Sequence, residues 1–128
     1  MQIVDANIVL RYILGDHEEL SAKAKKIVDE NIAEVPIEVL SEVVYILCGF
    51  YHIDRQEISA ALTNFLQNTQ SVLSRRDVVF KGLELYAETK LDFVDCILAG
   101  YHAAENAQIF TFDKPLNTLL NQISDSTR

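Results

Sequence analysis

Apolar residues recur every three to four positions along most of the chain, and this period predicts amphipathic helices. Short runs of consecutive apolar residues lie between them and predict buried strands. The predicted helices span residues 7–14, 17–31, 37–51, 55–68, 77–89 and 92–106, followed by a short helix that begins at 114. The predicted strands span residues 2–5, 33–35, 71–73 and 108–112. Strands that alternate with helices favour an α/β domain with a mainly parallel sheet.

Residues at the predicted helix ends support these boundaries. Gly15 follows the first helix, at the position where a left-handed C-cap favours glycine. Asp16 and Glu19 have the spacing of a capping box before the second helix. Asp54 and Glu57 repeat that spacing before the fourth. The helix starts and stops are therefore predicted by local signals as well as by periodicity.

Composition and charge narrow the class of protein. The chain has 128 residues, of which 49% are hydrophobic, 4 are Gly and 2 are Pro, so wholesale disorder and fibrous architectures are excluded. We expect one domain over residues 1–123, followed by a polar tail over residues 124–128, and no membrane span. The formal net charge of −8 disfavours a protein that coats nucleic acid. It does not disfavour an enzyme that gathers carboxylates around a metal ion.

Two cysteines, Cys48 and Cys96, stand far apart in helical patterns without the spacing of a metal site. We therefore expect buried thiols in a reducing compartment. The N-terminal segment carries Asp5 where a secretory signal would be basic, which adds to the expectation of a cytoplasmic protein. Aromatic residues at helical spacings are expected in the core rather than on a base-stacking surface: Tyr45, Phe50, Tyr51 and Tyr101.

Five carboxylates are predicted to gather at one edge of the sheet. Asp5 and Asp113 each end a predicted strand, and sites in open parallel sheets form at the carboxyl ends of strands. Glu42 lies in the second turn of a helix, and Asp92 and Asp95 share a face in the first turn of another. Such carboxylates repel one another unless their pKa values rise or a cation neutralises them. Oxygen ligands without nearby Cys or His favour Mg²⁺ or Mn²⁺ over zinc, and such a site suits phosphoryl chemistry.

Each of these acids also has a purely structural interpretation. Asp5 or Asp113, taken singly, could be only the N-cap of the next helix. Asp92 and Asp95 could only complement a helix dipole, and Glu42 could be a solvated flank residue. The functional interpretation depends on all of them facing one edge.

Four patches contain these acids in order: Ile3–Leu10, Leu40–Leu47, Asp92–Ala99 and Thr111–Asp113. With these patches the chain resembles the PIN-domain ribonucleases over nearly its whole length, and among them the short VapC-type toxins of toxin–antitoxin pairs. The resemblance implies a three-layer α/β/α domain that cuts RNA with Mg²⁺ or Mn²⁺. It also implies a homodimer and a cognate antitoxin that blocks the cleft.

The resemblance assigns roles to individual residues. It places Asp5, Glu42 and Asp95 at the positions of the family's central acids and Asp113 at the fourth, more variable position. Asp92 matches an additional acid of the family. Asn7 and Thr111 match positions that support the acids or a metal-bound water by hydrogen bonds. Because the chain is acidic, RNA would need a local basic rim, for which the sequence offers Arg11, Arg75, Arg76 and Lys114.

Three hypotheses follow for the function. The first is a metal-dependent endoribonuclease that acts as the toxin of a type II toxin–antitoxin pair. The second is a phosphatase with Asp5 as the nucleophile, although the second acid that such a site needs is replaced by Asn7. The third is a non-catalytic PIN-like module that binds proteins, and the full set of acids counts against it.

Overall fold

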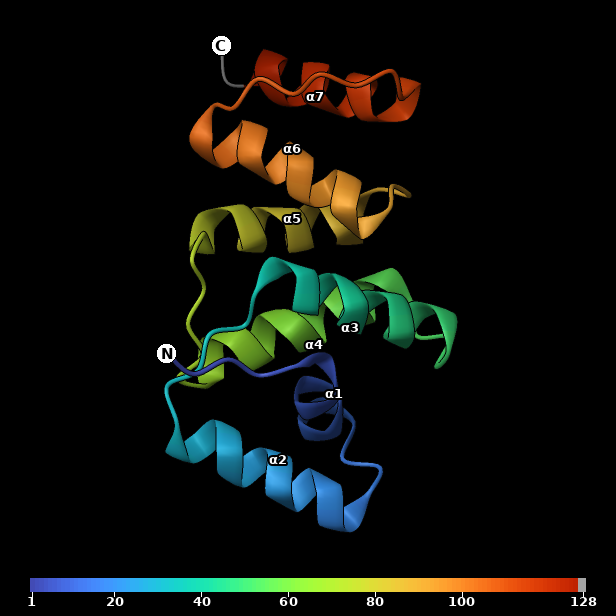
Figure 1. Ribbon diagram of the computed structural model, residues 1–128. Helices are drawn as coiled ribbons and strands as arrows, with labels where there is room; N and C mark the ends of the chain where they lie inside the picture. Colours follow the sequence, from blue (N-terminus) through green and yellow to red (C-terminus); the bar gives the residue numbers. More distant parts are fainter. Residues whose placement is uncertain (127–128) are drawn as a thin grey trace. The chain divides into compact units, whose positions relative to one another are not determined.

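The computed structural model describes residues 1–126, which form helices joined by short loops (Figure 1). The seven helices of this described part are α1 (Ala6–Leu14), α2 (Glu18–Glu30), α3 (Ile37–Gly49), α4 (Arg55–Asn68), α5 (Arg76–Glu88), α6 (Phe93–Glu105) and α7 (Lys114–Ser126). Every helix that the periodicity predicts is present. The last one extends into the segment predicted as a polar tail, of which residues 127–128 lie outside the described part.

The predicted parallel sheet is not formed within residues 1–126. Three of the four predicted strands meet only at two isolated parallel bridges, Ile3 with Glu34 and Glu34 with Val72. The accompanying backbone bonds run from Val4 N to Glu34 O (3.2 Å) and from Val35 N to Val72 O (3.0 Å). The three-layer α/β/α fold class with a mainly parallel sheet is therefore wrong, and the described chain is an assembly of helices.

The segments predicted as strands lack partners along their length. A strand is stabilised by a ladder of bonds over several residues, whereas each of these three segments contributes a single bridged position. The fourth predicted strand, residues 108–112, forms no bridge in the described chain, and the Phe110 and Phe112 side chains are exposed. The apolar pattern of such a short segment predicts an extended backbone, but it does not determine whether another strand pairs with that segment.

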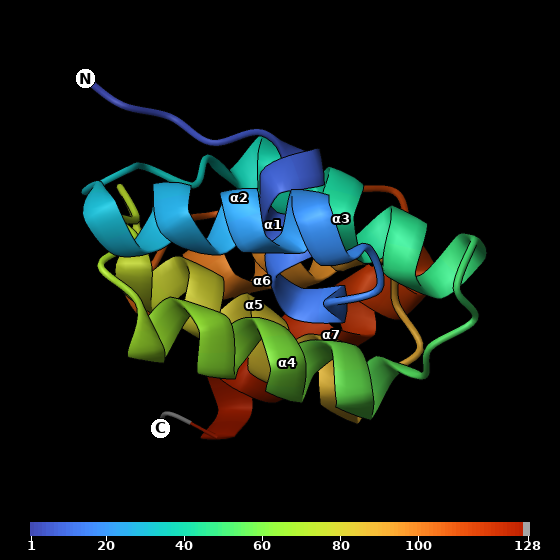
Figure 2. The ribbon, with the colours of Figure 1, turned by 90° about the horizontal axis from the view of Figure 1, so that it is seen from below.

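The chain divides into two compact units, one ending at Ser74 and the other beginning at Arg75. In the first unit, α1 packs against α2 and α3, and α3 packs against α4. Figure 2 shows α1 running crosswise to α2. The largest completely buried side chains of this unit are apolar: Val9, Val35, Leu40, Val43, Leu47, Ile58, Leu62 and Leu66.

In the second unit, α6 packs against both α5 and α7. The backbones of α5 and α6 approach closely where each carries a glycine. A Cβ atom added at Gly100 would lie 2.6 Å from the carbonyl oxygen of Val78, and one at Gly82 would lie 2.7 Å from the Ile97 side chain. Because such distances are shorter than van der Waals contact, the packing of α6 on α5 requires glycine at position 100, where the obstacle is backbone.

The helix ends follow the local signals with one exception. Gly15 ends α1 in the left-handed conformation (φ 60°), as predicted. Asp54 caps α4 by accepting a bond from Glu57 N at 2.9 Å, also as predicted. At α2, however, the cap is His17, whose Nδ1 accepts from Leu20 N at 3.1 Å. The predicted cap Asp16 instead accepts a hydrogen bond from Arg11 of α1.

Two predictions about burial are wrong. Cys96 is buried as expected, but Cys48 is exposed near the end of α3. Tyr45 and Phe50 are exposed at 78% and 74%, so they do not belong to the core. These residues follow the helical period of α3 without lying on its buried face, because α3 is apolar beyond the face that α1 and α4 cover. No helix within residues 1–126 is long and apolar enough to cross a membrane.

Candidate functional site

Asp5 stands at the start of α1 in the first unit. Its backbone is extended, and its Oδ1 accepts a hydrogen bond from Ile8 N at 3.1 Å, so Asp5 is the N-cap of this helix. The side chain is exposed, and the cap bond uses one of its two carboxylate oxygens. Asn7 lies two residues on in the first turn and is also exposed. Asp5 therefore does cap the helix, as its structural interpretation states, and its second carboxylate oxygen is not used by the cap bond.

Glu42 lies in the second turn of α3, also in the first unit. Its neighbours Val43 and Val44 are buried, whereas Glu42 itself is exposed. The apolar side of α3 therefore faces the core and fixes the helix, and the carboxylate of Glu42 is directed to the surface of the unit.

The second unit carries three acids that interact electrostatically. Asp95 lies in the first turn of α6 and is partly buried. Burial raises the pKa of Asp95 above its ordinary value, and the negative charges of Asp113 and Asp92 raise it further. The charges of Asp92 and Asp113 thus act on Asp95 within this unit. Their mutual repulsion favours either a proton on Asp95 or a nearby cation.

Asp92 and Asp113 stand at helix starts but are used differently. Asp92 occupies the N-cap position of α6 without making a cap bond from its side chain. Asp113 accepts a bond at Oδ2 from Leu116 N (2.9 Å) and thereby caps α7. The Asp113 amide donates to the hydroxyl of Thr111 at 3.0 Å. The resemblance predicts that Thr111 supports an acid or a metal-bound water, and here its hydroxyl bonds to the backbone of Asp113 rather than to the carboxylate.

The predicted acids are divided between the units. The first contains Asp5 and Glu42, and the second contains Asp92, Asp95 and Asp113. Among residues 1–126, no three His, Cys, Asp or Glu side chains come close enough together to enclose a metal ion. The donor chemistry nevertheless suits Mg²⁺ or Mn²⁺, because all the donors are carboxylates and Mg²⁺ commonly takes only one or two of them and keeps its waters.

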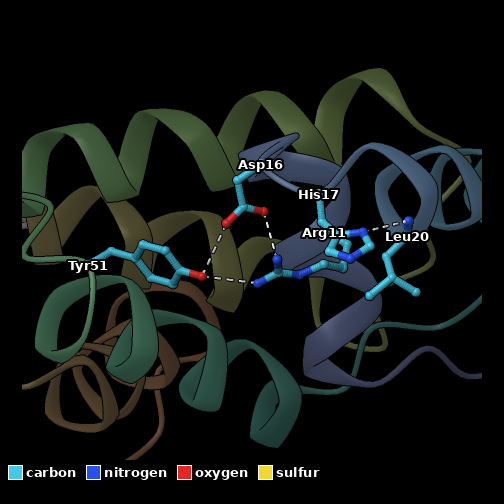
Figure 3. A network of polar contacts seen from close by, with 5 residues as sticks. All are labelled: Arg11, Asp16, His17, Leu20 and Tyr51. Carbon is cyan, nitrogen blue, oxygen red and sulfur yellow. Dashed lines mark hydrogen bonds and ion pairs between the residues drawn. The ribbon is translucent and has the colours of Figure 1, made fainter.

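Arg11, predicted as a contact for RNA, is engaged inside the first unit (Figure 3). Its Nη1 donates to Asp16 Oδ1 at 2.7 Å, and its Nη2 donates to the Tyr51 hydroxyl at 3.0 Å. The Tyr51 hydroxyl in turn donates to Asp16 Oδ2 at 3.4 Å. The three side chains tie α1, the loop before α2 and the loop after α3 together. No sequence spacing indicates this network, because Tyr51 is forty positions from Arg11.

The other predicted basic contacts lie in the second unit and are exposed. Arg75 pairs with Glu105 at 2.7 Å, and its guanidinium lies over the Tyr101 ring. Arg76 lies over the Phe80 ring, with 4.8 Å from its Cζ atom to the ring centroid. Lys114 begins α7 directly after Asp113. Lys114 is thus the basic residue nearest in sequence to the interacting carboxylates.

Comparison with known proteins identifies the class of this protein. The sequence model of the PIN domain matches residues 3–119, nearly the whole chain, and the chain therefore belongs to the PIN domain family. It is also similar to a VapC ribonuclease of Aquifex aeolicus (strain VF5), with 25% identity over 107 residues that cover 76% of this chain and 75% of the relative. No solved structure matches it. The resemblance found in the sequence is thus confirmed.

Proposed function

We propose that this protein is a metal-dependent endoribonuclease that hydrolyses RNA phosphodiester bonds and acts as the toxin of a type II toxin–antitoxin pair. The family and the VapC ribonuclease relative support this class of activity. The observation that carries the proposal is the match of the PIN domain over residues 3–119, and the raised pKa of Asp95, caused by burial and by the charges of Asp113 and Asp92, supports it. Carboxylates that lie near one another repel, and a bound cation relieves that repulsion.

Each acid has a proposed role toward Mg²⁺ or Mn²⁺. Asp5, Glu42, Asp95 and Asp113 are the proposed catalytic ligands, and Asp92 is an additional one. When bound, the ion would supply Lewis acidity toward the phosphate and an activated water. The charges of Asp113 and Asp92, which add to the effect of burial on the pKa of Asp95, would also attract a cation. Thr111 would hold Asp113, and Asn7 would support Asp5.

The charge of the chain limits how RNA is held. With a formal net charge of −8, the protein would repel RNA at long range unless bound metal and a basic rim offset its acids. Lys114 and Arg76 are the strongest candidates for that rim. Arg75 would first have to leave Glu105, and Arg11 is held by Asp16 and Tyr51. We further propose a homodimer, a cognate antitoxin that covers the acids, and a cytoplasmic location.

The proposal is tested by cleavage of a panel of small RNAs with Mg²⁺, with Mn²⁺ and with a chelator. We expect cleavage only with metal, and a loss of about 100-fold or more in Asp95→Asn. The matched control is Asp77→Asn, since Asp77 occupies the first turn of α5 as Asp95 does in α6.

The remaining outcomes distinguish the alternatives. Metal-independent cleavage, or equal activity in Asp95→Asn and Asp77→Asn, would reject the mechanism. A covalent phosphoaspartate trapped on Asp5 would instead favour the phosphatase. Absence of both divalent-metal binding and cleavage would favour the non-catalytic binding module.

A further inference from the structure

Asn117 lies in the first turns of α7 and is bonded backward to the loop that precedes the helix. Its side-chain Nδ2 donates to the carbonyl oxygen of Thr111 at 2.9 Å, across six residues. Asn117 is partly buried, and its own amide donates to the carbonyl oxygen of Asp113 at 3.0 Å. One residue thus contacts the backbone on both sides of Phe112.

The loop that Asn117 contacts has few other attachments. Its first end is fixed where Ala107 N donates to Tyr101 O and where the His102 ring contacts Ala107 O. Its second end is fixed by the bonds at Thr111 and Asp113. Between these ends, Phe110 is exposed at 86%, and residues 108–112 form no bridge in the described chain. The position of Thr111 therefore depends on the bonds at its own carbonyl and hydroxyl groups.

Those bonds determine where the Asp113 carboxylate lies. The Thr111 hydroxyl accepts a hydrogen bond from the Asp113 amide, and the Thr111 carbonyl oxygen accepts one from the Asn117 side chain. These two bonds fix the backbone from residue 111 to residue 113. The Asp113 carboxylate is then bonded at Oδ2 to Leu116 N. Asn117 acts on this carboxylate through Thr111, since its side chain bonds to the Thr111 carbonyl oxygen.

The residue type agrees with this role. Asn is a weak helix former, and a position inside α7 favours Leu, Lys or Ala on propensity alone. Asn121, one turn further along the same helix, is exposed and offers a matched comparison. Asn117 differs from Asn121 in pointing its amide back to the loop.

We infer that Asn117 is a positioning residue that fixes the Asp113 carboxylate relative to Asp95 by holding the carbonyl of Thr111. Its importance for metal binding rests on the proposed function, whereas its hold on the loop does not. The amide group is required because Thr111 presents a carbonyl oxygen, which needs a donor.

The experiment measures amide hydrogen exchange and Mg²⁺ affinity on the full chain for wild type, Asn117→Ala and Asn121→Ala. We expect Asn117→Ala to lose protection of the Asp113 and Leu116 amides and to bind Mg²⁺ about tenfold more weakly, as for other partners that orient metal ligands. Asn121→Ala should change neither quantity. Asn117→Leu, which restores helix propensity without a donor, should behave as Asn117→Ala.

Two results would overturn the inference. Wild-type protection of both amides in Asn117→Ala and Asn117→Leu would show that Asn117 does not hold the loop. Equal losses in the Asn121 variant would show a general effect on α7. If wild type binds no Mg²⁺, the proposed function fails, and the exchange data alone still decide whether Asn117 holds Asp113.

Discussion

Asp5 in the first unit and Asp113 in the second have the same local setting and a different electrostatic one. Each follows an apolar segment and caps the helix that comes next, through Ile8 N and Leu116 N respectively. Only Asp113 contributes to a shift in a neighbouring carboxyl group, since its charge helps to raise the pKa of Asp95. A helix-capping bond therefore does not exclude a functional role, and the charges around the cap are what distinguish the two acids.

The largest effect is expected when Asp5 is replaced with Asn. Asn caps helices as well as Asp does, so Asp5→Asn should leave the melting temperature nearly unchanged. If Asp5 is a catalytic ligand, RNA cleavage should fall by about 100-fold or more. Asp54→Asn is the control, because Asp54 caps α4 in the same unit by the same kind of bond. If Asp5→Asn cleaves RNA as fast as wild type, Asp5 is only a helix cap and not a catalytic ligand.

In the second unit, Gly100 of α6 packs closely against α5, whereas Gly49 at the end of α3 in the first unit has open space around it. Gly100→Ala places a methyl group 2.6 Å from the Val78 carbonyl oxygen and should lower the free energy of unfolding by about 1–3 kcal/mol. Gly49→Ala meets no atom within 4 Å and should be neutral or slightly stabilising. Denaturant unfolding measures both. Equal stabilities of the two variants would contradict the observed contact.

In the first unit, the network of Arg11, Asp16 and Tyr51 joins three segments of the chain. Tyr51→Phe removes the hydroxyl that accepts from Arg11, and we expect a loss of about 1 kcal/mol in the free energy of unfolding. Tyr45→Phe, at an exposed position of α3, should have almost no effect. RNA cleavage should survive in both variants. A stability effect no larger than that of Tyr45→Phe would argue against the network.

The smallest effect is expected from the charge of Asp113. The pKa of Asp95 is higher in the folded protein than its ordinary value of 3.8. The free energy of unfolding therefore decreases as the pH rises from 3.8 through the pKa of the folded state. Asp113→Asn keeps the cap and removes one repelling charge, so the pKa of Asp95 should fall and the metal-free protein should gain a few tenths of a kcal/mol at neutral pH.

Carbon-detected NMR titration of Asp95 measures this change, with Asp125→Asn as the control for an exposed acid of α7. An unchanged Asp95 titration in Asp113→Asn would remove the evidence that the two carboxylates interact.

The helices could be predicted from the sequence because their signals are local. The apolar period, Gly15 and the cap at Asp54 each act within one or two turns of chain. The sheet was predicted wrongly, because pairing depends on partners far away in sequence, and within residues 1–126 only Ile3, Glu34 and Val72 form bridges.

The site shows the same division. The positions of Asp92, Asp95 and Asp113 at helix starts were read from the sequence, and their role as ligands stays a prediction. The burial that is the main cause of the raised pKa of Asp95 depends on packing, and the bond from Asn117 to Thr111 depends on the course of the loop. The one sequence signal for Asn117 is a weak helix former early in a helix. The partner of Arg11, Tyr51, has no such signal.

Calorimetric titration of Mg²⁺ into the metal-free full chain tests directly whether the carboxylates around Asp95 bind a divalent ion. We expect saturable binding by wild type and by Asp77→Asn, and binding at least about tenfold weaker by Asp95→Asn. Absence of saturable binding at millimolar Mg²⁺, or identical affinities of wild type and Asp95→Asn, would contradict this expectation.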